Sequence, residues 1–165
     1  MRKLIQILFL LSTSIIISSC GYQLRDSINV DGLNRVLITG SSENEITRLL
    51  QQKLPGSQLI KNVTEEKYPI IGIINIKTSK RQLSVNSSGR ADEYEISKTL
   101  KYQLILSGDI KHTGNLTANA SYDFDESQMQ GTKEKEIIAN DSITRALTRK
   151  LVLRLKSALK ASSVQ

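Results

Sequence analysis

Cysteine and histidine, which supply most thiol and transition-metal chemistry, occur once each in the 165-residue chain, as Cys20 and His112. One cysteine cannot form an intramolecular disulfide, and one cysteine with one histidine cannot complete a structural zinc site. The chain also lacks the signatures of P-loop ATPases, Rossmann domains, α/β-hydrolases and zinc proteases. We therefore expect no metal, no non-covalent cofactor and no enzymatic activity.

Two further candidates for chemistry have simpler interpretations. Asp123, Asp125 and Glu126 are close in sequence, but they lack the spacing and the central glycine of an EF-hand calcium loop. A solvated acidic strand end accounts for them. His112 has no cysteine, aspartate or serine motif around it, so we interpret it as an exposed residue in a turn.

Basic residues are the remaining candidates for a binding function, because lysine and arginine number 23 against 16 acidic residues. Lys80, Arg81 and Arg90 flank a hairpin signal at Ser87–Gly89, and Lys133 falls in a predicted loop before the last helix. Such residues can make charge-assisted contacts with the phosphates of an anionic glycolipid. The alternative is that they protect a strand edge and aid solubility.

A second basic group lies along the C-terminal part of the predicted last helix, where no acidic residue interrupts it. Its position at the C-terminal end of the helix suits the helix macrodipole. No aromatic residue interleaves these charges to offer a stacking platform, so we expect no nucleic-acid partner. The group consists of Arg145, Arg149, Lys150, Arg154, Lys156 and Lys160.

The N-terminus has the form of an export signal. Two basic residues precede an apolar stretch over residues 4–17, which is shorter and more polar than the roughly 20 apolar residues of a membrane-spanning helix. The segment Ile17–Cys20 resembles the lipobox of bacterial lipoproteins, whose cysteine thiol takes a diacylglycerol. We expect residues 1–19 to be a cleaved lipoprotein signal peptide and Cys20 to carry a diacylglycerol and an N-acyl chain. A free cysteine beyond an ordinary signal peptide is the alternative.

The segment after the cysteine indicates destination and organisation. By resemblance to lipoprotein sorting, Gly21 in place of aspartate favours the outer membrane. Residues 20–32 are polar and contain turn formers, so we interpret them as the acylated cysteine and a tether. The remainder predicts one α+β domain over residues 33–160 and a short tail at 161–165.

The domain opens with a strand and a helix. Aliphatic residues predict a strand over Leu33–Thr39. The segment Ser42–Glu45 matches a capping box, and apolar residues at helical spacing follow it until Pro55–Gly56 ends the helix. Residues 59–67 are polar and predict irregular structure.

A run of β-branched residues comes next. Ile70–Thr78 suits a strand buried on both faces, and Gln82–Asn86 is interpreted as its continuation after a bend at Ser79–Lys80. Ser87–Gly89 then predicts a hairpin turn.

The clearest pattern covers two long strands and a helix. Apolar residues alternate over Tyr94–Leu106 and again over Leu116–Phe124, with turn-forming glycines at 108 and 114 between them. Helical spacing then runs from Glu134 to about Leu159. This order predicts an α+β fold in which two helices pack on one face of a four-stranded sheet.

Several of these landmarks resemble the LPS-assembly lipoprotein LptE family. The segment Cys20–Arg25, with the sequence CGYQLR, resembles the start of the mature chains of that family. Ala91–Tyr94 at the opening of a long strand, Tyr122–Asp123 at the close of the next, and Lys133–Glu136 at the opening of a helix that contains Leu147 are also similar. The resemblance extends over essentially the whole mature chain and depends on the order and spacing of these short motifs.

The resemblance implies a non-catalytic outer-membrane lipoprotein that plugs the LptD β-barrel, assists its assembly and binds LPS. It implies the same fold of two helices on a four-stranded sheet. Lys133 looks like the counterpart of a basic residue implicated in LPS contact. Ser87 falls near a second such position, for which Arg90 is the nearest basic candidate, with Lys80 and Arg81 close by. The alternative is an outer-membrane lipoprotein whose similar domain binds another envelope protein or an anionic lipid.

Overall fold

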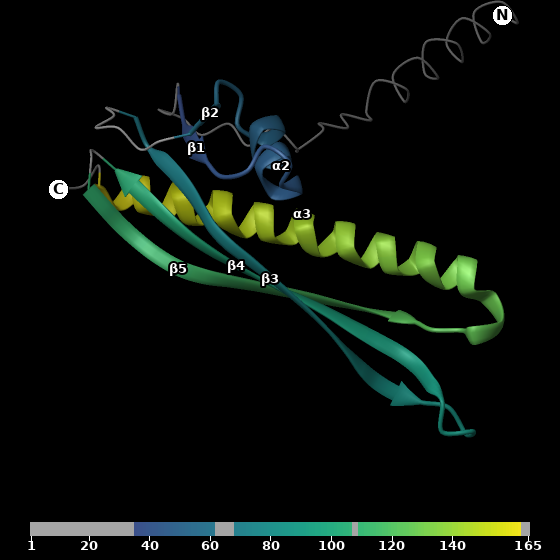
Figure 1. Cartoon of the computed structure of the whole chain (residues 1–165). Coiled ribbons are helices and arrows are strands. Elements are labelled where there is room, and N and C mark those ends of the chain that lie inside the picture. The colour runs from purple at the N-terminus through teal and green to yellow at the C-terminus, as the bar shows by residue number, and fades with distance from the viewer. Residues whose placement is uncertain (1–34, 62–67, 107–108, 163–165) are drawn as a thin grey trace, which may run out of the picture.

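A computed structural model describes residues 35–61, 68–106 and 109–162 of the chain. The expected signal peptide and the whole expected tether, residues 20–32 with Cys20, lie outside these residues. The elements, in order, are β1 (Leu37–Thr39), α2 (Glu45–Lys53), β2 (Gln58–Ile60), β3 (Ile70–Val85), β4 (Ala91–Leu106), β5 (Asp109–Asp123), a 3₁₀ turn (Glu126–Gln128) and α3 (Met129–Ser162) (Figure 1). The α+β class is confirmed.

The sheet has five strands in the order β2-β1-β3-β4-β5, so the expected count of four is wrong. The additional strand is β2, which lies partly in the segment expected to be irregular and pairs in parallel with β1. Backbone groups make this pairing and any sequence supplies them, and three residues are too few to show a periodicity of two. The strands β3, β4 and β5 pair antiparallel, as the hairpin signals predict.

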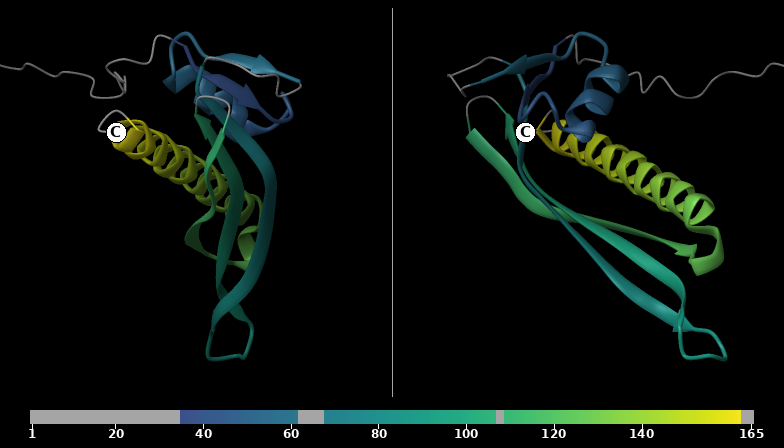
Figure 2. Two further views of the ribbon diagram at one scale, coloured as in Figure 1. Left: turned by 90° about the vertical axis from the view of Figure 1, so that its left-hand side faces the viewer. Right: turned by 45° about the vertical axis from the view of Figure 1, so that its right-hand side comes forward.

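Both helices contribute to one core with the same face of the sheet (Figure 2). The alternating residues of β4 and β5 point into this core, as expected, and α3 packs along β5 and β4. Its deeply buried members include Ile38 of β1, Ile46 and Leu50 of α2, Leu100, Tyr102 and Leu104 of β4, and Leu147, Leu151 and Leu155 of α3. A smaller cluster of Leu37, Ile70 and Ile105 is buried apart from it.

The helices begin elsewhere than the sequence predicts. The N-cap of α2 is Asn44, whose side-chain oxygen accepts a hydrogen bond of 2.9 Å from the Ile46 N–H, so the expected capping box at Ser42–Glu45 is wrong. Helix α3 begins at Met129, which places Lys133 in its second turn and not in a loop. The sequence does not predict this first turn, because the residues around Gly131 are polar and show no apolar repeat at helical spacing.

The expected turn between β4 and β5 is also shorter than predicted. Strand β5 begins at Asp109, so His112 and Gly114 lie within the strand and do not form a turn. Gly114 is paired with Tyr102, and a Cβ atom at Gly114 would lie 3.3 Å from the Tyr102 hydroxyl oxygen. The glycine therefore makes room for a buried tyrosine on the neighbouring strand.

Strand β3 is buried only at its start. Ile70 and Ile71 are buried, but Ile74 is 47% exposed, so the expected burial of the whole run on both faces is wrong. The reason is geometric, since β1 pairs with Ile70–Gly72 alone and α3 lies over the other strands. The strand continues to Val85 without ending at Ser79–Lys80, and the register skips Ile74 and Leu83 as bulged residues.

Candidate functional site

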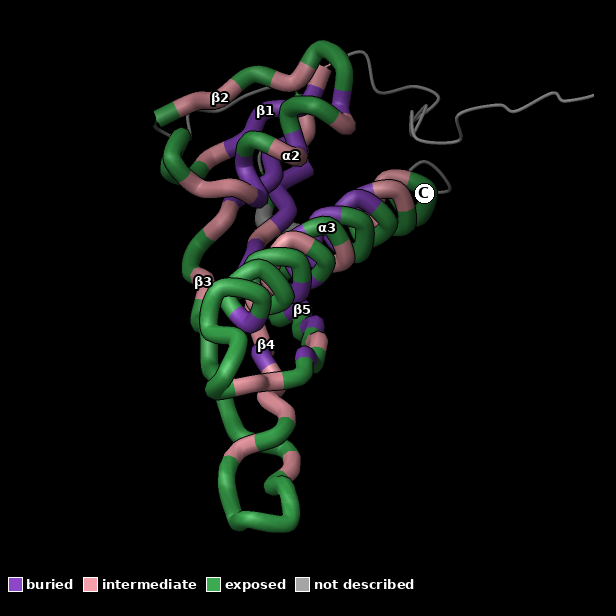
Figure 3. Tube along the Cα trace, turned by 90° about the vertical axis from the view of Figure 1, so that its right-hand side faces the viewer, coloured by how far each residue is buried: buried purple, intermediate pink, exposed green. Residues whose placement is uncertain are grey.

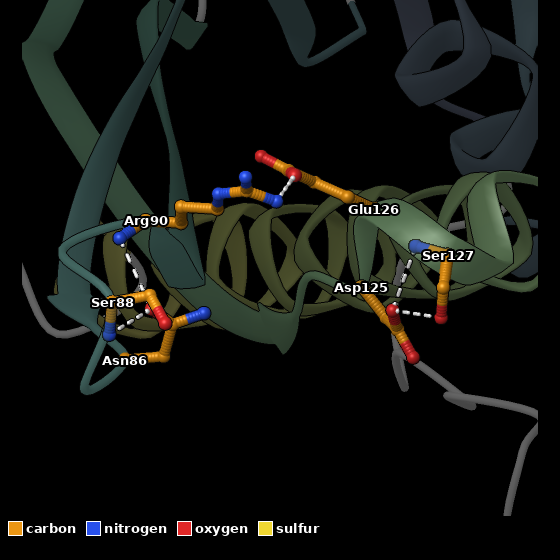
Figure 4. Close-up of polar contacts among 6 residues, drawn as sticks. All are labelled: Asn86, Ser88, Arg90, Asp125, Glu126 and Ser127. Carbon is orange, nitrogen blue, oxygen red and sulfur yellow. Dashed lines mark hydrogen bonds and ion pairs between the residues drawn. The ribbon is translucent and has the colours of Figure 1, made fainter.

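The hairpin of β3 and β4 ends in a tip at residues 86–90 that projects beyond the end of β5 (Figures 1 and 2). Asn86 organises this tip, because its side-chain oxygen accepts hydrogen bonds from the N–H groups of Ser88 at 3.0 Å and Arg90 at 3.1 Å (Figure 4). Gly89 adopts the left-handed conformation, with φ of +73°, that the tight turn requires. The backbone of Arg90 is thereby fixed to the turn.

Arg90 connects this tip to the segment that leads into α3. Its guanidinium donates to Glu126 at 2.9 Å, and the two side chains face each other across the space between the elements (Figure 4). The 3₁₀ turn that carries Glu126 is capped by Asp125, which accepts hydrogen bonds from the Ser127 N–H and hydroxyl. These hydrogen bonds from Ser127 hold the pKa of Asp125 below its ordinary value.

A second contact joins β3 to α3, and Lys80 lies at its centre. Its ammonium donates to a carboxylate oxygen of Glu136 at 3.0 Å, and the Tyr122 hydroxyl donates to the same oxygen at 2.9 Å. The ammonium also lies 4.7 Å from the ring centroid of Tyr94 and 5.1 Å from that of Tyr122. We call Lys80, Tyr94, Tyr122 and Glu136 the Lys80 cluster. No sequence pattern reveals it, because its members come from four different elements.

The electrostatics of the Lys80 cluster stabilise its ion pair. The hydrogen bond from Lys80 holds the pKa of Glu136 below its ordinary value, in spite of partial burial. Burial alone would lower the pKa of Lys80, but its hydrogen bonds with Tyr122 and Glu136 outweigh that effect and raise it. Burial raises the pKa of Tyr122, which therefore stays protonated and able to donate.

Arg81 is the next residue along β3 and lies on the opposite face of the sheet, since successive side chains in a strand alternate. It donates to Glu95 of β4 at 2.7 Å, and the Asn119 side chain of β5 donates to the other carboxylate oxygen at 2.7 Å. These hydrogen bonds, from Arg81 first and Asn119 second, lower the pKa of Glu95. Arg81 is thus separated by the sheet from Lys80.

Lys133 differs from the other three basic candidates, because it has no ion pair with any acid in the part of the chain that the structure describes. It is exposed on α3 between Met129 and Ile137, one turn before and one turn after it, each of which is 59% exposed. Ile138 is also largely exposed. A cation thus lies among large apolar side chains on the surface, a combination that the expectation of a loop did not reveal.

The structure therefore brings Lys80, Arg90 and Lys133 to one end of the molecule, where the hairpin meets the start of α3. We call residues 80–94 and 122–138 the distal end. Arg81 belongs to it in sequence but faces away from α3. Within residues 35–61, 68–106 and 109–162, no three side chains of histidine, cysteine, aspartate or glutamate are placed to hold a metal ion. No helix in the same ranges is long and apolar enough to cross a membrane.

The fold is similar to those of two solved lipoproteins. The rare lipoprotein B from Shewanella oneidensis matches with a TM-score of 0.65 at 17% identity, covering 79% of this chain and 99% of that one. An uncharacterized lipoprotein B from Nitrosomonas europaea matches with a TM-score of 0.64 at 20% identity, covering 86% of this chain and 94% of that one. At these identities the likeness establishes a shared fold.

Sequence comparison gives the family. The chain is 23% identical over 99 residues to the LPS-assembly lipoprotein LptE of Pectobacterium atrosepticum, a match that covers 58% of this chain and about half, 54%, of that relative. Residues 26–155 match the sequence model of the LptE family, described as lipopolysaccharide-assembly. This match includes nearly all of the domain described above, and the chain therefore belongs to the LptE lipopolysaccharide-assembly family.

Proposed function

We propose that this protein is a lipid-anchored outer-membrane subunit of the LPS translocon that plugs the LptD β-barrel, assists its assembly and binds LPS during insertion. Membership of the family supports this role, and so does the likeness of the fold to solved lipoproteins. The anchor is the diacylglycerol and N-acyl chain proposed on Cys20. Several acyl chains at about 0.8 kcal/mol per buried methylene give stable membrane attachment.

The observation that carries the LPS part of the proposal is the surface around Lys133. LPS combines phosphate groups with acyl chains, so a protein that binds it needs cations next to apolar surface. Lys133 lies between exposed Met129 and Ile137 and is not neutralised by any acid among the residues described. Arg90 is the second contact that we propose, once a phosphate competes with Glu126 for its guanidinium.

Lys80 and Arg81 have smaller roles in this proposal. Each donates to a carboxylate that two donors hold in place, so a phosphate would have to displace an intramolecular ion pair. We assign Lys80 to positioning the start of α3 against β3. Arg81 faces away from α3 and contributes to the opposite face of the sheet.

LPS binding by the purified, acylated chain in detergent tests this assignment. Lys133→Glu should weaken binding by roughly fivefold or more, because one basic residue near an anionic lipid contributes about 1 kcal/mol. Arg149→Glu makes the same charge change 16 residues along α3, roughly 24 Å away, and should leave binding nearly unchanged. Equal effects of the two variants would show a response to net charge and would contradict a site at Lys133.

The alternative of a lipoprotein that binds anionic lipid alone is separated by two measurements. Phosphatidylglycerol vesicles should compete poorly with LPS in the binding assay. Depletion of the protein in cells should lower the amount of folded LptD and of surface LPS. Unchanged levels of both in depleted cells would contradict the proposed function.

A further inference from the structure

The sheet has an exposed edge along β3. Strand β3 runs from Ile70 to Val85, but β1 pairs only with Ile70–Gly72. From Ile73 to Val85 the side of β3 away from β4 has no strand partner among the residues described, and Figure 3 shows this part of β3 as mostly exposed. Every second residue of such an edge directs its N–H and C=O groups outward, where they can pair with another strand.

Strand β5, at the other edge of the sheet, differs from β3 because α3 lies over it. Helix α3 packs along β5, and the Lys150 ammonium donates to the backbone carbonyl oxygen of Thr117 at 2.6 Å. The helix thus lies over this strand, and the lysine occupies one of its backbone acceptors. On β3 between Asn75 and Gln82, no backbone group of the outer edge has a comparable side-chain contact within the described part of the chain.

Charged side chains usually protect an open edge, and β3 carries Lys77, Lys80 and Arg81. Two of these three are held by carboxylates of the protein itself, since Lys80 pairs with Glu136 and Arg81 pairs with Glu95. Only Lys77 remains without an ion pair to a described residue. The bulged residues Ile74 and Leu83 flank an unbroken register from Asn75 to Gln82, so the regular part of the edge is eight residues long.

We propose that the edge of β3 from Asn75 to Gln82 binds an extended segment of the barrel partner by β-strand addition, with an acidic side chain of that segment near Lys77. This inference rests on the proposed function for the identity of the partner. A second copy of this chain is a poor occupant, because Ile70–Val85 contains three basic residues and no acid. Antiparallel pairing of β3 with itself would place like charges opposite each other.

Hydrogen–deuterium exchange on the full, acylated chain, alone and in complex with LptD, tests the proposal. Alternate amides between Asn75 and Gln82 should exchange rapidly in the free protein. We expect them to slow by about tenfold or more in the complex, because they acquire hydrogen-bond acceptors. The amides of β5 near Thr117 serve as the internal control and should change little.

Two single proline variants provide the functional arm. Thr78 and Ser79 are adjacent and exposed, and their N–H groups point to opposite sides of the strand. Thr78→Pro and Ser79→Pro should therefore differ: one removes a bond to β4 and lowers the unfolding midpoint, and the other removes only an outward donor. The variant with the unchanged midpoint should bind LptD about tenfold more weakly, as for the loss of roughly one backbone hydrogen bond.

Matched variants separate the backbone effect from a side-chain effect. Thr78→Ala and Ser79→Ala retain both N–H groups and should bind as the parent does. Lys77→Glu should weaken binding, since it would repel the proposed acidic side chain.

The outcomes distinguish this inference from the function on which it rests. A complex with LptD in which the β3 amides exchange as in the free protein would overturn strand addition and leave the proposed function intact. Protection of the same amides in the purified chain alone would overturn the choice of partner in favour of a second copy. Failure of the parent chain to form any complex with LptD would contradict the proposed function and the partner assigned to this edge together.

Discussion

Beneath the C-terminal half of α3 the helix meets the sheet through aliphatic side chains, whereas at the distal end the same helix meets it through charges and hydroxyl groups. Leu147, Leu151 and Leu155 are fully buried in the core that α3 shares with the sheet and α2. At the other end, Lys80 and Arg90 reach carboxylates on Glu136 and Glu126, and Met129 and Ile137 are left exposed. One half of the helix therefore supplies stability, and the other is available for ligands.

The largest expected effect concerns the buried half. Leu151→Ala should lower the free energy of unfolding by about 2–5 kcal/mol, because it removes a fully buried side chain and leaves a cavity. Leu153→Ala on the same helix removes a side chain that is 56% exposed and should cost well under that. Urea unfolding measures both, and equal losses would contradict the assignment of the core.

Glycines in the two regions provide the next contrast. Gly114→Val should destabilise the fold by about 1–3 kcal/mol, since the new side chain would press on the buried Tyr102 ring. Gly131 lies in the first turn of α3, where a Cβ atom would meet open space. Gly131→Ala should therefore stabilise the fold by up to about 1 kcal/mol. Thermal unfolding distinguishes the signs, and a stabilising Gly114→Val would refute the packing described for that strand pair.

The ion pair of the Lys80 cluster should have a smaller, pH-dependent effect. Glu136→Gln should cost less than about 1 kcal/mol at neutral pH, because both partners are more than one-third exposed. The pKa of Glu136 is lowered in the folded state, so its contribution is present above the ordinary carboxyl value of 4.5. That contribution is lost as the pH falls through the folded pKa.

Unfolding curves from pH 7 to pH 3 check this dependence. The difference between Glu136→Gln and the parent should shrink as the pH falls. Glu134→Gln, at an exposed position two residues earlier, is the control and should follow the parent throughout. A difference that grows on acidification would show that the carboxylate does not stabilise the cluster.

The smallest effect on stability is expected at Glu126. The pair between Arg90 and Glu126 is exposed on both sides, so Glu126→Gln should change the free energy of unfolding by less than about 0.5 kcal/mol. The same change releases Arg90 and should strengthen LPS binding by roughly twofold or more. Weaker LPS binding in this variant would show that Arg90 needs Glu126 for its position.

The sequence predicts the core correctly where apolar side chains recur at a regular spacing. It does not predict contacts made by backbone groups or by long polar side chains. The alternation over Tyr94–Leu106 and the helical spacing from Ile143 to Leu159 identify the core correctly, since burial on one face imposes the pattern. The sequence does not predict strand β2 or the position of Gly114 within β5, because neither depends on a hydrophobic repeat.

The candidate site divides in the same way. Lys80, Arg81, Arg90 and Lys133 are identifiable as basic residues near a hairpin and a helix start. Their partners are separated by up to 56 residues in sequence, as Lys80 and Glu136 are, so no local pattern reveals which cations are neutralised. The environment of Lys133 depends on where α3 begins, and the first turn of α3 lacks the apolar repeat that predicts the rest.

The most direct test of the central claim is purification of the acylated, full-length chain from outer membranes in detergent, followed by identification of the proteins that remain bound. A subunit of the LPS translocon should be recovered in a stable complex with LptD. Leu153→Ala, which changes an exposed residue outside the distal end, should be recovered with LptD to the same extent. Recovery of the folded parent chain without LptD would contradict the account.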